Sequence, residues 1–140
     1  MSKVFIDTNI LIYALDQANP EKQAKARALL KSLQESSSGV VSTQVFQEFY
    51  VVATSKLKVN ALLAKKMIAY LANFETVTVD LPMIKQAIDI LSADQISFWD
   101  ALIVSSAKAS GCRVIWTEDL NHHQLIKGVI IKNPFLVGEC

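Results

Sequence analysis

The sequence predicts an α/β fold, a three-layer α/β/α sandwich with a central, mostly parallel sheet of four to five strands. Short apolar β-like runs recur along the chain, and each of the first three gaps between them holds two helical patterns. Such gaps contain far more chain than a hairpin needs, and long helical crossovers join parallel neighbours. The runs are also continuously apolar, which is typical of strands covered on both faces.

The expected strands are short, and the helical patterns between them set their order. The strands are Val4–Ile6, Val40–Thr43, Val77–Val79, Arg113–Trp116 and Val129–Ile131. The expected helices are Asn9–Leu15, Glu21–Gln34, Gln44–Ser55, Asn60–Asn73, Pro82–Leu91 and Phe98–Ser110. Pro20 suits the first turn of the second helix, whose core stripe is expected at Ala24, Ala28 and Leu33. Gly111 is expected to terminate the last helix.

Composition excludes several classes of protein. Apolar residues make up 51% and charged residues 19% of the 140 residues, which excludes intrinsic disorder. A net charge of +1 gives no sign of a globally basic nucleic-acid binder. No apolar run approaches the roughly 18 residues of a membrane span, so we expect a cytoplasmic protein. Cys112 and Cys140 form no disulfide framework or zinc motif, and the loop-like cluster Ser36–Gly39 is too short to separate two domains.

Two carboxylates follow predicted strands. Asp7 comes directly after the first strand, and Asp119 lies just past the fourth. Ligands of open parallel sheets bind outside the carboxyl ends of the strands, so both acids stand where a site is expected. A helix N-cap is the alternative for Asp7, and an ordinary loop acid is the alternative for Asp119.

Two further carboxylates lie on apolar helical faces. The residues that share a face with Glu48 are Val45, Val51 and Val52, and those beside Asp100 are Ile103 and Val104. An unpaired carboxylate on such a face is costly unless something compensates its charge. A solvated face is the alternative for Glu48, and a favourable first-turn acid is the alternative for Asp100.

The four acids together predict a divalent-cation site. Two carboxylates about 5 Å apart repel by roughly 3 kcal/mol at an effective dielectric constant of 20, so a cluster needs counter-charge. No Lys or Arg is adjacent in sequence to Asp7, Glu48 or Asp100. Mg²⁺ or Mn²⁺ suits an open carboxylate site with oxygen ligands.

These residues also carry a family likeness that extends over essentially the whole chain. The stretches are Phe5–Leu11, Ser42–Gln44 with Glu48–Phe49, Trp99–Ile103 and Thr117–Leu120. In order and spacing they resemble the four motifs of PIN-domain ribonucleases, and most of all the VapC-type toxins of toxin–antitoxin pairs. The resemblance implies that residues 1–140 form a single PIN-like nuclease domain.

The resemblance implies roles for particular positions. Asp7, Glu48, Asp100 and Asp119 match the acidic quartet that holds Mg²⁺ or Mn²⁺ and serves catalysis. Asn9 and Thr117 match supporting polar positions, and Glu118 is a further, more peripheral acid. The stretch Asn121–Gln124 departs from the family, where a Gly-Gln turn is frequent, which puts the local loop conformation in doubt.

The expected function is therefore divalent-metal-dependent hydrolysis of RNA phosphodiester bonds by the toxin of a type II toxin–antitoxin pair. The resemblance implies a cognate antitoxin as partner and a homodimer. No membrane association is expected, because no apolar run is long enough to cross a bilayer. The alternatives are a PIN nuclease of RNA processing and a catalytically silent metal-binding or interaction module, such as a receiver-like domain.

Surface and core residues allow weaker predictions. Two lysine-rich sets are candidates for RNA backbone contacts or plain solvated faces: Lys22, Lys25, Arg27 and Lys31, and Lys56, Lys58, Lys65 and Lys66. Core packing is favoured over base stacking for Phe98, Trp99 and Trp116. His122 and His123 are expected in a surface loop.

Overall fold

The computed structural model describes residues 2–136, and its centre is a six-stranded sheet in the order β3-β2-β1-β4-β6-β5. The strands are β1 (Val4–Ile6), β2 (Gly39–Ser42), β3 (Glu75–Val77), β4 (Val114–Trp116), β5 (Leu125–Ile126) and β6 (Val129–Lys132). All neighbouring strands run parallel except β5 and β6. The mostly parallel sheet is confirmed, and it has one strand more than predicted.

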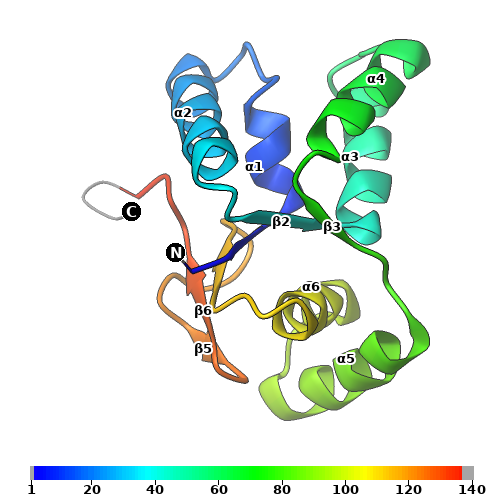
Figure 1. Ribbon diagram of the computed structural model, residues 1–140, viewed down its shortest axis with the longest axis vertical. Coiled ribbons are helices and arrows are strands. Elements are labelled where there is room, and N and C mark those ends of the chain that lie inside the picture. The colour runs from blue at the N-terminus through cyan, green and yellow to red at the C-terminus, as the bar shows by residue number, and fades with distance from the viewer. Residues whose placement is uncertain (1, 137–140) are drawn as a thin grey trace.

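Helices cover both faces of this sheet (Figure 1). On one face lie α1 (Thr8–Tyr13), α2 (Pro20–Ser36), α3 (Thr43–Ser55) and α4 (Ala61–Leu71), and on the other lie α5 (Leu81–Asp94) and α6 (Phe98–Ala109). The three-layer sandwich predicted from the sequence is therefore confirmed. No helix within residues 2–136 is long and apolar enough to cross a membrane.

Local sequence signals set the helix boundaries. Side chains of short polar residues accept backbone N–H hydrogen bonds at the starts of five helices, and these residues are Asp7, Ser42, Asn60, Asp80 and Ser97. Pro20 begins α2, as expected for a residue without a backbone N–H. Gly111 has a φ of 79° just beyond α6, which confirms it as the terminator of that helix.

The sheet is buried on both faces, as its continuous apolar strands predicted. All four residues of β2 are buried, as are Phe5, Ile6 and Ile115 in the neighbouring strands. Gly39 lies so close to the ring of Phe74 that a β-carbon built on it would be 2.6 Å from the Phe74 Cδ1 atom. The start of β2 therefore requires a residue without a side chain.

The third strand lies two residues earlier than predicted. Val41 of β2 pairs with Thr76, and Ser42 pairs with Val77. Because Ser42 then caps α3, no further residue of β2 can pair with Thr78 or beyond. Val79 donates its N–H to the Thr43 hydroxyl at 3.1 Å instead, so it lies outside the strand.

The unpredicted strand β5 forms a hairpin with β6. The pair is joined by Lys127 and Gly128, whose φ angles are 50° and 84°. Positive φ at both central residues is the geometry of a tight hairpin turn. Lysine is not a usual first residue of such a turn, and the strand has only two residues, so little in the sequence indicates the hairpin.

Two predictions about core residues are wrong. In α2 the buried residues are Ala26 and Leu33, with Leu29 and Leu30 packed beside them, whereas Ala24 and Ala28 are exposed. Alanine contributes little apolar area, so the leucines decide which face is buried. In α6 the side chain of Trp99 is 61% exposed, although Trp116 is buried as expected.

We predict that Gly39→Ala lowers the free energy of unfolding by about 1–3 kcal/mol, because the added methyl group overlaps the Phe74 ring. Urea denaturation measures the change. The Phe74→Leu substitution in the same chain is expected to recover part of this loss, since it removes the overlapping ring atoms. Strictly additive effects of the two substitutions would contradict the proposed overlap.

Candidate active site

Asp7 occupies the junction between β1 and α1 and is almost fully buried, with 5% of its surface exposed. One carboxylate oxygen accepts the Thr8 N–H at 2.7 Å, and the other accepts the Thr117 hydroxyl at 2.7 Å. The N-cap expected as an alternative is therefore present. It uses only one oxygen, so it does not account for the buried contact with Thr117.

Thr117 connects the ends of the two central strands. Its hydroxyl donates to Asp7 and accepts hydrogen bonds from the Asn9 side-chain amide at 3.2 Å and the Asp119 N–H at 3.1 Å. The buried Asn9 Oδ1 atom has no hydrogen-bond partner among residues 2–136. Both polar residues expected to support the acids thus lie beside Asp7.

Glu48 projects from the middle of α3 toward α1. Its carboxylate accepts the Thr8 hydroxyl at 2.8 Å and the Gln44 side-chain amide at 3.4 Å. The same Gln44 amide also donates to the backbone carbonyl of Trp99 at 3.1 Å, which connects α3 to the start of α6. Thr8 and Gln44 were not predicted as site residues, although both lie inside the sequence motifs that flank the acids.

Asp100 lies in the first turn of α6, as predicted, but it is not the cap of that helix. Ser97 is the cap, because its hydroxyl oxygen accepts the Asp100 N–H at 3.1 Å. Burial raises the pKa of the Asp100 carboxyl, and the Asp119 charge adds to this rise while Ser97 opposes it. The carboxyls of Asp100 and Asp119 therefore act on each other electrostatically.

The strongest electrostatic perturbation is at Asp7. Burial raises the pKa of its carboxyl from the ordinary value of 3.8 to about 7. The hydrogen bonds from Thr117 and Thr8 lower this pKa, whereas the charges of Asp119 and Glu48 raise it further. The ionised form of Asp7 is thus disfavoured in the protein by itself and would be favoured by a nearby cation.

Glu118 differs from the other acids because it has a counter-charge. Its carboxylate forms an ion pair with the Lys22 ammonium at 3.0 Å and accepts the Tyr13 hydroxyl. The Lys22 ammonium also lies 4.5 Å from the centre of the Tyr13 ring. Glu118 therefore stabilises the packing of α2 against the loop after β4, consistent with its expected peripheral place.

One cavity of about 430 Å³ brings most of the predicted acids together. Among the residues that line it are Asp7, Asn9, Glu48, Glu118 and Asp119. Asp100 is not among its lining residues and joins the group through Asp119. We call this the acid cavity. A larger cavity of about 520 Å³ lies between α2 and α4, but Glu75 is the only acid along it in the part of the chain that the structure describes, so it offers no comparable chemistry.

Among residues 2–136, Lys56 at the end of α3 is the only basic residue that lines the acid cavity. It stands eight residues after Glu48, which corresponds to about 12 Å of helix rise. Side chains of a helix lean in the same direction, so their charges keep about that separation. Two unit charges 12 Å apart in water attract by only ~0.3 kcal/mol, so Lys56 does not neutralise Glu48.

The donor atoms around the acid cavity fit Mg²⁺ or Mn²⁺ in chemistry. Asp7, Glu48 and Asp119 supply carboxylate oxygens without a bonded cation, and the unpartnered Asn9 oxygen is of the same hard type. Across residues 2–136, however, no three acidic, histidine or cysteine side chains are arranged closely enough to hold an ion. Coordination by the quartet would therefore require the side chains to move closer together.

The fold and this site define a class of protein: parallel α/β/α sandwiches that gather carboxylates outside the carboxyl ends of their central strands. Residues 4–127 match the PIN domain family. The chain therefore belongs to the PIN-domain family, as the sequence motifs indicated.

Solved structures share this fold at low sequence identity. A toxin–antitoxin complex from Klebsiella pneumoniae aligns with a TM-score of 0.70 at 18% identity, covering 96% of this chain and 98% of that chain. The Mycobacterium tuberculosis toxin VapC20, which cleaves the sarcin–ricin loop, aligns with a TM-score of 0.65 at 21% identity, covering 84% of this chain and 92% of that chain. DNA-bound VapBC from Salmonella typhimurium aligns with a TM-score of 0.69 at 20% identity, covering 94% of this chain and 98% of that chain. No curated protein matches the chain in sequence.

We predict that Asp7→Asn stabilises the metal-free protein at pH 8 by about 2–4 kcal/mol, because it removes a buried charge. The folded-state pKa of Asp7 is raised from 3.8 to about 7, so its contribution to wild-type stability falls as pH rises across that range. Thermal unfolding in EDTA between pH 4 and pH 8 measures both effects.

Addition of Mg²⁺ should stabilise the wild type more than the Asp7→Asn variant, because the variant lacks one of the charges that attract the ion. The exposed Asp89 on α5 provides the matched control. Asp89→Asn should change neither the pH dependence of stability nor the stabilisation by Mg²⁺. Equal pH profiles for the wild type and Asp7→Asn would contradict the buried-charge interpretation.

Proposed function

We propose that this protein is a divalent-metal-dependent endoribonuclease that hydrolyses RNA phosphodiester bonds. The observation that carries the proposal is the buried Asp7 carboxyl, which shares the acid cavity with Glu48 and Asp119 and has no basic partner among the described residues. Membership of the PIN-domain family supports the same chemistry. The catalytic and metal-binding roles are assigned to Asp7, Glu48, Asp100 and Asp119.

In the proposed mechanism the quartet would hold Mg²⁺ or Mn²⁺. Such an ion lowers the pKa of a bound water and stabilises charge on the leaving oxygen. Thr117 and Thr8 fix the carboxylates of Asp7 and Glu48 through hydrogen bonds from their hydroxyls. Asp119 is exposed and Glu48 is half-buried, so either carboxylate is placed to accept a proton from the attacking water.

RNA as the substrate and a toxin role are the finer parts of the proposal. They are supported by the resemblance to VapC-type toxins and by neighbours in structure that include an RNA-loop-cleaving toxin. A PIN nuclease of RNA processing is the alternative enzyme. A catalytically silent module is disfavoured because all four acids of the quartet are present, and family membership removes the receiver-like alternative.

We further propose that the protein is held inactive by a cognate antitoxin. Several structural neighbours are toxin–antitoxin complexes, some of them bound to DNA. An arginine side chain of the partner would suit the acid cavity, since a guanidinium bridges clustered carboxylates with parallel hydrogen bonds. A homodimer and a cytoplasmic location remain predictions from the sequence.

We predict that Asp100→Asn reduces cleavage of single-stranded RNA in Mg²⁺ or Mn²⁺ by about 100-fold or more, because a carboxylate of the site is lost. Gel analysis of a labelled RNA measures the rate, and circular dichroism verifies the fold. Asp89→Asn is the matched control, and EDTA should abolish cleavage by the parent protein. Cleavage by Asp100→Asn at the parent rate would refute the site assignment.

We also predict that induced expression of the protein in bacterial cells arrests growth and produces RNA fragments, whereas expression of Asp100→Asn does neither. The readouts are growth curves, RNA integrity and immunoblots that establish equal protein levels. Growth arrest by both proteins would argue against a toxin that acts through RNA cleavage. RNA cleavage in vitro without growth arrest would favour the RNA-processing alternative.

A further inference from the structure

Lys56 is an exposed residue that lines the acid cavity. Glu48, Val52 and Lys56 follow one another at intervals of four along α3, and all three line this cavity. One face of a single helix therefore carries an acid of the proposed quartet at one point and a cation two turns later.

The ammonium group of Lys56 has no structural partner that explains its position. Lys56 is exposed, and its side chain makes no hydrogen bond or ion pair within the part of the chain that the structure describes. It is also too far along α3 from Glu48 to neutralise that carboxylate. A favourable interaction with the carboxyl end of α3 is the remaining structural explanation.

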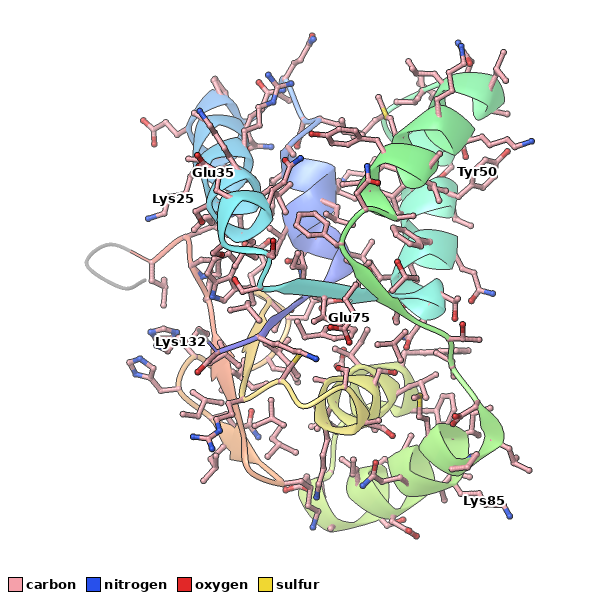
Figure 2. The ribbon with its side chains drawn as sticks, in the orientation of Figure 1. Lys25, Glu35, Tyr50, Glu75, Lys85 and Lys132 are labelled. Carbon is pink, nitrogen blue, oxygen red and sulfur yellow. The ribbon has the colours of Figure 1, made fainter. Side chains whose placement is uncertain are left out.

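The other lysine-rich stretch offers no comparable cation. Lys22 is engaged by Glu118, and the Arg27 Nε donates to the Ala14 carbonyl at 2.8 Å. Lys25 points outward from α2, as Figure 2 shows. Of the two lysine sets found in the sequence, only Lys56 lies on the acid cavity.

We propose that the Lys56 ammonium binds a backbone phosphate of the RNA strand that enters the acid cavity, close to the phosphate that is cut. The inference rests on the proposed function and identifies how the substrate is held. Backbone phosphates are repelled by carboxylates, and a divalent ion would compensate only the acids that hold it, so a further positive charge on the cavity wall favours entry of the strand. An ammonium with three N–H donors binds phosphate as a point charge and has no base preference.

The test separates substrate binding from cleavage. Binding of a labelled single-stranded RNA is measured in Mg²⁺ with the Asp100→Asn protein, which should not cut it, over a range of salt concentrations. Adding Lys56→Gln should weaken binding about fivefold and reduce the slope of log affinity against log salt by about 0.7, the value for one phosphate contact of a single strand. Lys56→Arg should keep the slope.

Lys65→Gln is the matched control, because Lys65 is an exposed lysine of the neighbouring helix α4 outside the acid cavity. It should change neither affinity nor slope. In proteins that retain Asp100, Lys56→Gln should raise KM more than it lowers kcat, which a role confined to the end of α3 would not produce.

An unchanged salt slope in Lys56→Gln, with the fold intact, would overturn the proposal. An equal loss of RNA affinity in Lys65→Gln would also overturn the proposal, since the loss would then reflect the overall positive charge of the protein and not a contact made by Lys56. Failure of the proposed function gives a different result, because the parent protein would then not cleave RNA in either metal.

Discussion

The structure depends on keeping one buried carboxylate, that of Asp7, in a fixed place. Its two oxygens are held by the Thr8 N–H and the Thr117 hydroxyl, and its own N–H donates to the Trp116 carbonyl. These bonds require β1 and β4 to pair in the observed register, with Ile6 opposite Trp116. A slip of one residue would turn Asp7 and Thr117 to opposite faces of the sheet. The chemistry of the site therefore depends directly on the register of the two central strands.

Most of the fold could be predicted because its signals are local. Apolar runs separated by pairs of helices indicated the parallel sheet, and Pro20 and Gly111 marked helix ends through properties of single residues. The failures have non-local causes. The third strand is set by its partner, since β2 ends where Ser42 caps α3. The exposure of Trp99 depends on which elements pack against its face of α6, and its apolar neighbours in sequence carry no information about that packing.

The site could be predicted only in part for a related reason. Acids at strand ends and on apolar faces are visible in a sequence, and Asp7, Glu48 and Asp119 do line one cavity. The residues that hold them are harder to find, because Thr8 and Gln44 are ordinary polar residues whose roles arise from contacts between separate helices. The pairing of Glu118 with Lys22 joins positions 96 residues apart, and no spacing rule anticipates it.

The distribution of the quartet along the chain has a consequence for biosynthesis. Its members come from positions 7, 48, 100 and 119, and β4, which Thr117 follows directly, is inserted between β1 and β6. A nascent polypeptide that has emerged from the ribosome only as far as α5 contains β1, β2 and β3, but it lacks both later acids. For the proposed ribonuclease, the quartet is therefore incomplete until residue 119 has left the ribosome, and a shorter nascent chain cannot cut any RNA, including the transcript and ribosome that are producing it.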